Sequence, residues 1–177
     1  FPTRRSSDLD ADWRKNMLVT GSNASGKSTF VKAVAVNLIL AQSVCTCWAK
    51  SVRMPRAQVI TSMAIRDNVQ GGESYFIVEI KSLKRILTAL RGDVLTLCFI
   101  DEILRGTNTV ERIAASTALL TYIGAQNALC IAATHDMELT KLLPDYRQVH
   151  FREEITPQGM VFPSAFWAPM YVSSAVE

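Results

Sequence analysis

Apolar residues along this chain alternate between two patterns, short continuous runs and longer stretches with helical spacing. Residues 94–100 are apolar except for Thr96, and residues 128–133 form a second apolar run. Such short runs are typical of strands buried on both faces of a parallel sheet. The pattern predicts strands at residues 16–20, 58–63, 94–100 and 128–133, and helices at residues 27–41, 73–90, 110–124 and 137–143.

The stretch 73–90 has the clearest amphipathic pattern. Its predicted apolar face consists of Phe76, Ile80, Leu83, Leu87 and Leu90. Because strands and helices alternate along the chain, we expect an α/β domain with a mainly parallel sheet flanked by helices. Near the end, residues 149–151 and 159–162 are predicted to pair as a terminal hairpin.

Composition and charge fit a globular domain. The chain has 177 residues, of which 49% are hydrophobic and 20% are charged, and its formal net charge is +3. This charge is too small to indicate nucleic-acid binding by itself. The longest apolar stretch, residues 31–44, is interrupted by Lys32, Asn37 and Gln42, so no membrane span is predicted. No secretory signal is visible, so we expect a cytoplasmic location.

The four cysteines do not have the spacing of a zinc site. Cys45 and Cys47 are too close together for the usual ligand pair, and no second pair completes a site. Cys98 and Cys130 fall inside predicted strands, where we expect reduced, buried thiols.

The two ends of the chain lack the patterns of the rest. Residues 1–9 (FPTRRSSDL) resemble a peptide translated from sequencing-adapter DNA, so we expect a non-native leader there. Residues 164–177 have no clear hydrophobic periodicity. Two interpretations of this segment stay open, a native extension and a frameshifted end. The folded domain is therefore expected at residues 10–163.

A phosphate-binding loop is predicted between the first strand and the first helix. Residues 21–28 (GSNASGKS) fit G-x-x-x-x-G-K-[ST] in that context; a chance glycine-rich loop is the alternative. Glycines let successive N–H groups point inward, and the positive end of the helix adds to this field. We expect Lys27 to bridge the β- and γ-phosphates of ATP and the Ser28 hydroxyl to ligate Mg²⁺. The expected ATP contacts are Gly21, Ser22, Asn23, Ala24, Ser25, Gly26, Lys27, Ser28 and Thr29.

Two acids follow the predicted strand 94–100, at the edge where open α/β sheets bind ligands. Asp101 is expected to hold Mg²⁺, and Glu102 to orient and polarise the attacking water, unless both are solvated turn residues. His135 follows strand 128–133 and would reach the γ-phosphate; a helix-start histidine without chemistry is the alternative. The predicted catalytic residues are Lys27, Glu102 and His135.

The loop at residues 105–109 allows two interpretations. Thr109 caps the following helix, or the loop contacts a partner subunit. His150 lies in a predicted edge strand with no motif around it, so it receives no role.

Four ordered segments resemble the ATPase domain of the MutS family of DNA mismatch-repair proteins, which belongs to the ABC-type ATPase superfamily. They are TGSNASGKST, GGESYFIVE, LCFIDEILRGTNTVER and ATHD, and the resemblance runs from about residue 13 to residue 162. It implies an ABC-ATPase-like P-loop fold in which two domains pair head to tail, as a homodimer or with a MutS-like partner. Ser74 would then contact the γ-phosphate bound by the other subunit. A plain helix N-terminus is the alternative for Ser74.

The chain departs from the family pattern in three ways. Ser22 and Ala24 replace the usual proline and methionine, but both positions contribute mainly backbone. Glu73 stands where the family has a basic or small residue, and its charge is unfavourable beside phosphate. The mismatch-reading domain, connector, lever and clamp are missing, so we expect a fragment whose DNA contacts lie in absent domains.

The implied function is Mg²⁺-dependent ATP binding and hydrolysis that drives switching of the dimer and of DNA clamps. One alternative is another ABC-type ATPase of DNA repair or chromosome maintenance, although no coiled-coil insertion or LSGGQ-like signature is visible. The other is a nucleotide-dependent interaction module with little hydrolysis. Whether the full protein repairs mismatches, and whether the fragment is active alone, stay open at this point.

Overall fold

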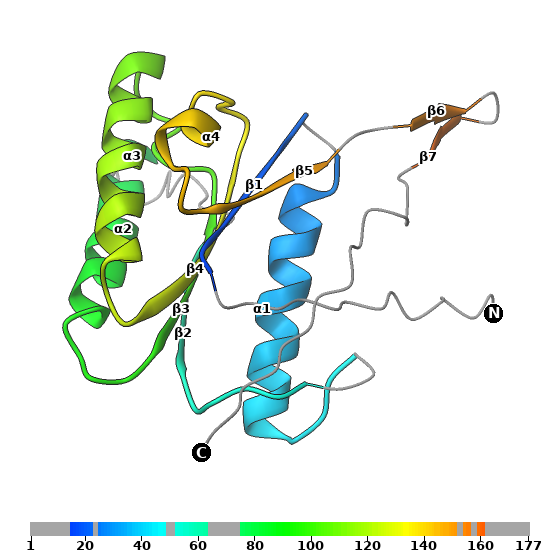
Figure 1. Cartoon of the computed structure of the whole chain (residues 1–177), viewed down its shortest axis with the longest axis vertical. Coiled ribbons are helices and arrows are strands. Elements are labelled where there is room, and N and C mark those ends of the chain that lie inside the picture. The colour runs from blue at the N-terminus through cyan, green and yellow to red at the C-terminus, as the bar shows by residue number, and fades with distance from the viewer. Residues whose placement is uncertain are drawn as a thin grey trace.

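The computed structural model of this chain describes residues 15–22, 25–48, 52–63, 75–151, 154–156 and 159–161. Its main strands are β1 (Met17–Gly21), β2 (Gln58–Ser62), β3 (Thr96–Asp101), β4 (Ala128–Thr134) and β5 (Arg147–Phe151). They form one all-parallel sheet in the order β2-β3-β4-β1-β5 (Figure 1). The predicted α/β architecture with a mainly parallel sheet is confirmed.

Helices cover both faces of the sheet. Helix α1 (Lys27–Ser43) lies on one face, and α2 (Tyr75–Ala89), α3 (Thr109–Gly124) and the short α4 (Leu139–Leu142) lie on the other (Figure 1). The strand order explains this division. The chain crosses from β1 to the far edge of the sheet at β2, and then returns in the opposite direction through β3 and β4 to β5. Because crossovers are right-handed, reversing the direction moves the connecting helix to the opposite face. None of the described helices has the length and apolar character needed to cross a membrane.

Side chains alternate along each strand between two apolar cores. Met17, Val19 and Phe99 belong to the core beneath α1. Leu18 and Ile100 belong to the core beneath α2 and α3. The central strands are therefore buried on both faces, which explains why their sequences read as continuous apolar runs.

Helix α2 buries a different face from the predicted one. The predicted leucines lie in or against the core, but Phe76 and Ile80 are 38% and 41% exposed, and Ile86 is completely buried instead. The buried line runs through positions 79, 83, 86 and 90, and its first member is Glu79. The apolar pattern gave no reason to place the charged Glu79 on the buried face of the helix. The predicted face is therefore rotated about the helix axis relative to the observed one.

The predicted hairpin of residues 149–151 with 159–162 is wrong. Strand β5 pairs in parallel with β1, and the antiparallel pair is β6 (Glu154–Thr156) with β7 (Gly159–Val161). Apolar packing explains the position of β5, because the ring centroids of Phe151 and Phe30 lie 5.5 Å apart above the α1 face of the sheet. Pairing with β1 brings Phe151 onto that core.

The prediction for the cysteines in the strands is confirmed. Cys98 and Cys130 are register partners in β3 and β4, and both are fully buried and free. Burial raises the pKa of the Cys98 thiol to about 12, so the unreactive protonated form dominates at neutral pH. Across the described ranges, no group of three or more His, Cys, Asp or Glu side chains is arranged to hold a metal ion.

We predict that Ile86→Ala lowers the free energy of unfolding by about 2–5 kcal/mol, because it opens a cavity at a completely buried position. Ile80→Ala, on the more exposed side of the same helix, is the matched control and should cost less than about 1 kcal/mol. Urea unfolding followed by circular dichroism measures both values. Equal losses from the two variants would contradict the observed orientation of α2.

Candidate functional site

The carboxyl ends of β1, β3 and β4 meet at one edge of the sheet, and a polar loop leaves from each. Gly21 ends β1, Asp101 ends β3, and His135 directly follows β4. Strand β4 lies between β1 and β3, so His135 comes from the strand between the glycine loop and the acids. Open α/β sheets bind their ligands at this edge.

The loop after β1 has the backbone conformation that its glycines permit. Gly21 has a φ of 147°, and a Cβ there would lie 2.4 Å from the Phe151 carbonyl oxygen. Gly26 has a φ of 94° at the start of α1, and a Cβ there would meet nothing within 4 Å. Left-handed backbone favours glycine at both positions. The predicted ligands Asn23 and Ala24 fall outside the described residues.

Two buried polar side chains belong to this loop and to the first turn of α1. The Lys27 Nζ donates to the carbonyl oxygens of Gly21 at 2.7 Å and Ser22 at 2.5 Å. The Ser25 Oγ is buried and has no hydrogen-bond partner in the described part of the chain. Buried polar groups are normally bonded, so a cation and an unused hydroxyl at a helix N-terminus fit an anionic ligand. Thr29, two residues after Lys27, is exposed.

Ser28 and Asp101 meet at this edge, although 73 positions separate them in the sequence. The Ser28 Oγ donates to the Asp101 Oδ1 at 2.9 Å, an ordinary hydrogen-bond length. Hydroxyl and carboxylate oxygens are hard ligands of the kind that Mg²⁺ prefers. The tertiary structure therefore joins the two predicted metal ligands.

Glu102 lies in a strained turn beside His135. Its φ of 61° is left-handed, which costs a non-glycine residue on the order of 1–3 kcal/mol and is typical of functional sites. Its backbone N–H donates to the Ala133 carbonyl oxygen of β4 at 2.9 Å. The Glu102 carboxylate contacts the Arg105 guanidinium, and its Oε1 lies 3.9 Å from the His135 Nδ1. Two of the predicted catalytic side chains are therefore neighbours.

The family model of MutS domain V matches residues 17–163, which include the glycine loop, both acids and His135. The chain belongs to the MutS family. It is 36% identical to DNA mismatch repair protein MutS 2 of Halobacterium salinarum and to DNA mismatch repair protein MutS of Bacillus velezensis, each over 159 residues. Each match covers 87% of this chain and 18% of the relative. The MutS protein of Thermus aquaticus is 33% identical over 148 residues, which cover 82% of this chain and 18% of that protein.

In this MutS-family chain, Asp136 is a buried acid for which the sequence suggested no role. Arg112 of α3 holds it with two bonds, from Nε to Oδ2 at 2.8 Å and from Nη2 to Oδ1 at 2.7 Å. The Asp136 N–H donates to the Thr134 Oγ1 at 3.0 Å, so these three bonds fix the turn that carries His135. The sequence signal that could have pointed to Asp136 was its place directly after His135. Its partner, Arg112 on α3, could not be identified from the sequence.

Three further predicted residues have separate outcomes. Asn108, and not Thr109, caps α3, because the Asn108 Oδ1 accepts from the Glu111 N–H at 3.0 Å. His150 lies in β5 at the edge of the sheet, as expected, and its Nδ1 is 3.0 Å from the Thr20 Oγ1. Ser74 falls outside the described residues, so its predicted contact stays a prediction.

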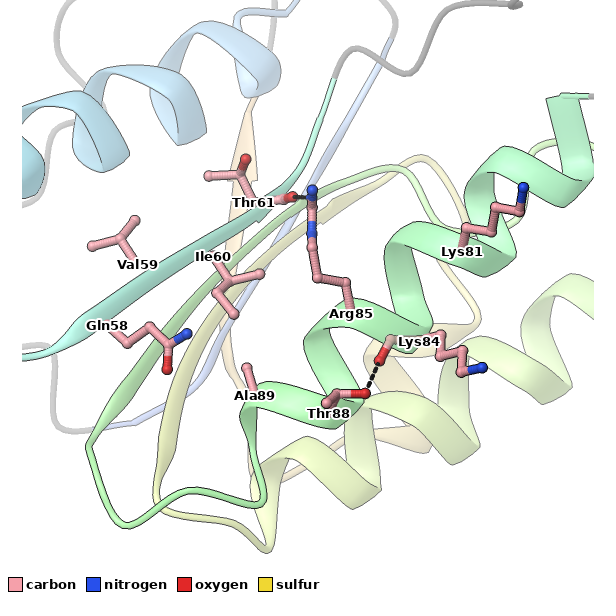
Figure 2. A pocket seen from close by; sticks show the side chains of 9 residues that line it. All are labelled: Gln58, Val59, Ile60, Thr61, Lys81, Lys84, Arg85, Thr88 and Ala89. Atoms are coloured by element: carbon pink, nitrogen blue, oxygen red, sulfur yellow. Dashed lines mark hydrogen bonds between the residues drawn. The ribbon is translucent and has the colours of Figure 1, made fainter. Parts of the chain in front are cut away.

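A separate groove runs between the edge strand β2 and helix α2 (Figure 2). Its volume is about 740 Å³, and it is lined by Gln58, Val59, Ile60, Thr61, Lys81, Lys84, Arg85, Thr88 and Ala89. The Arg85 Nη2 donates to the Thr61 carbonyl oxygen at 2.7 Å, which satisfies a backbone acceptor of the edge strand. None of these lining residues belongs to the cluster at the carboxyl edge, so the groove is distinct from the candidate site.

We predict a pH-dependent stability difference between Asp136→Asn and the wild type. Hydrogen bonds from Arg112 hold the pKa of Asp136 below its ordinary value. Its ionised form therefore stabilises the fold above the unfolded pKa of about 3.9, and this contribution is lost as the pH falls through the lower folded pKa. Asp136→Asn should cost about 1–3 kcal/mol at pH 7, and the difference should shrink at about pH 3.

Urea unfolding at the two pH values measures this difference. Glu138→Gln, which neutralises an exposed acid two residues away, is the control and should change stability little at either pH. A deficit for Asp136→Asn that is the same at both pH values would contradict the role of the ionised pair.

Proposed function

We propose that this chain is the ATP-binding and ATP-hydrolysing domain of a MutS-like DNA mismatch-repair or DNA-surveillance protein. The observation that carries the proposal is the bond between Ser28 and Asp101, because it joins the phosphate-loop helix to the acid that ends β3. Membership of the MutS family supports it over other ABC-type ATPases, and the relatives named above are DNA mismatch repair proteins.

Phosphate binding in this proposal uses the loop after β1 and the first turn of α1. Gly21 and Gly26 allow the loop to turn, and the N–H groups at the start of α1 attract an anion. Lys27 exchanges its bonds to loop carbonyls for bonds to the β- and γ-phosphates. The Ser25 hydroxyl gains the partner that it lacks among the described residues.

Magnesium fits the pair formed by Ser28 and Asp101. Mg²⁺ in nucleotide sites is usually held by one or two protein side chains together with phosphate oxygens and water. The Ser28 hydroxyl and the Asp101 carboxylate supply two oxygen atoms that already lie 2.9 Å apart. When bound, the ion neutralises charge on the phosphate oxygens.

Hydrolysis in this proposal depends on Glu102, which orients the attacking water. The water oxygen bonds to the γ-phosphorus, the bond from phosphorus to the β–γ bridging oxygen breaks, and ADP and phosphate leave. The Glu102 carboxylate accepts a proton from the water. His135, whose Nδ1 lies 3.9 Å from that carboxylate, supplies a hydrogen bond toward the γ-phosphate.

A second subunit completes the site in this proposal. Ser74 of one chain meets the γ-phosphate held by the other, in a homodimer or with a MutS-like partner. The matched relatives are far longer than this chain, which covers 18% of two of them. DNA binding is therefore assigned to other parts of the full protein, and ATP turnover switches the dimer and the DNA clamp.

We predict that Glu102→Ala lowers steady-state phosphate release by about 100-fold or more, because it removes the group that accepts the proton. The Kd for ATP should stay within about twofold of the wild-type value, since Glu102 acts on water and not on the nucleotide. Phosphate release and binding of a fluorescent ATP analogue measure the two effects.

Glu138→Ala is the matched control for Glu102→Ala, because it removes an exposed carboxylate at the start of α4. It should leave both turnover and binding unchanged. Wild-type turnover in Glu102→Ala would refute the assignment of the base. Tight ATP binding without turnover in the wild-type chain would favour the interaction module over the ATPase.

We also predict that phosphate release per chain rises with protein concentration and levels off as subunits pair, because each site needs a second chain. Lys27→Ala should abolish release at every concentration, since it removes the buried cation that contacts phosphate. Sedimentation analysis over the same concentrations gives the fraction of paired chains. Release per chain that stays constant while this fraction changes would contradict a composite site.

A further inference from the structure

Glu79 of helix α2 has a carboxylate that is almost completely buried, at 2% exposure of the residue. Its Oε1 accepts a bond from the Arg105 N–H at 3.1 Å, and its Oε2 accepts one from the Gly106 N–H at 3.3 Å. A buried carboxylate is unfavourable unless it is hydrogen-bonded, and bonds from backbone N–H groups to an ionised carboxylate are strong. Both oxygens of Glu79 are therefore used to hold the backbone of one loop.

The loop that Glu79 holds contains the proposed base. Glu102 and Leu104 both have left-handed backbone, with φ of 61° and 54°. Neither is a glycine, so this conformation is unfavourable and persists only where surrounding contacts impose it. The contact from Glu102 N–H to Ala133 fixes the start of the loop, and the two bonds to Glu79 fix its next turn.

A second contact attaches the same loop to α2. A Cβ placed on Gly106 would lie 3.2 Å from the Phe76 Cβ and 3.4 Å from the Phe76 Cα. Glycine thus lets the loop lie directly against the first turn of the helix. Helix α2 begins at Tyr75, the residue after Ser74. The helix that contacts the Glu102 loop therefore directly follows the serine that is proposed to contact the partner's nucleotide.

We propose that Glu79 is a positioning residue for ATP hydrolysis: it holds the Glu102 loop in its strained conformation and ties that loop to α2. The inference rests on the proposed function and adds a residue to it. Glu79 touches no reacting atom in this account. It acts through the backbone of Arg105 and Gly106, and so couples the proposed base to helix α2.

The test compares Glu79→Ala and Glu79→Gln in the full chain. Glu79→Ala should lower kcat by about 10- to 100-fold, since small displacements of a catalytic group have effects of this size. The Kd for ATP should change little, because the phosphate loop is not involved. Glu79→Gln keeps one acceptor oxygen and should recover part of the lost kcat, whereas Glu138→Ala, an exposed acid, should behave as wild type.

Amide hydrogen exchange gives a readout that is independent of activity. In Glu79→Ala, the amides of Arg105 and Gly106 should exchange at least about tenfold faster, while the β4 amides stay protected. If Glu79→Ala fails to fold, Gly106→Ala replaces it, because its new methyl group pushes the loop away from Phe76 and should lower kcat in the same way.

Unchanged kcat together with unchanged exchange at Arg105 and Gly106 would overturn the inference. A loss of kcat with an equal loss of ATP binding, and no rescue by glutamine, would also overturn it by showing a merely structural role. If the wild-type chain hydrolyses no ATP, the proposed function fails. The positioning role in catalysis then fails with it, and the exchange rates alone decide whether Glu79 holds the loop.

Discussion

Parallel pairing of β4 with both β1 and β3 is the constraint on which the candidate site depends. It aligns the carboxyl ends of three strands, so the loops that follow them leave from one edge. The strand interiors are apolar and buried, and their pairing helps to set how far Ser28 lies from Asp101. The hydrogen bond between these two side chains follows from that alignment.

Beneath this edge lies a set of buried charges, each satisfied in a different way. Lys27 donates to backbone carbonyls, Glu79 accepts from backbone N–H groups, and Asp136 pairs with Arg112. Such groups are unfavourable in a core unless they are bonded. These bonds offset the cost of burial, and through them the three side chains hold the glycine loop, the loop of Glu102 and the turn of His135.

Backbone strain is distributed unevenly over the same edge. Gly21 and Gly26 take left-handed conformations where only the backbone is required, so glycine relieves the strain at no loss. Glu102 takes a left-handed conformation although it carries a side chain, so surrounding contacts must impose this backbone conformation. This difference explains why the second loop is anchored from β4 and from α2, through Ala133 and Glu79.

The sequence by itself determined the alternation of strands and helices and the place of a glycine loop between the first strand and the first helix, because both depend on short-range periodicity and spacing. It misplaced β5 and the buried face of α2, since strand partners and helix rotation depend on contacts between distant segments. Glu79 shows the reason most clearly. A charged residue in a helix is expected to face solvent, and only the two backbone donors, 26 and 27 positions away, explain its burial. The contact between Ser28 and Asp101 was likewise decided by tertiary structure, because it depends on how α1 packs across the sheet against β3, which is two strands away from β1.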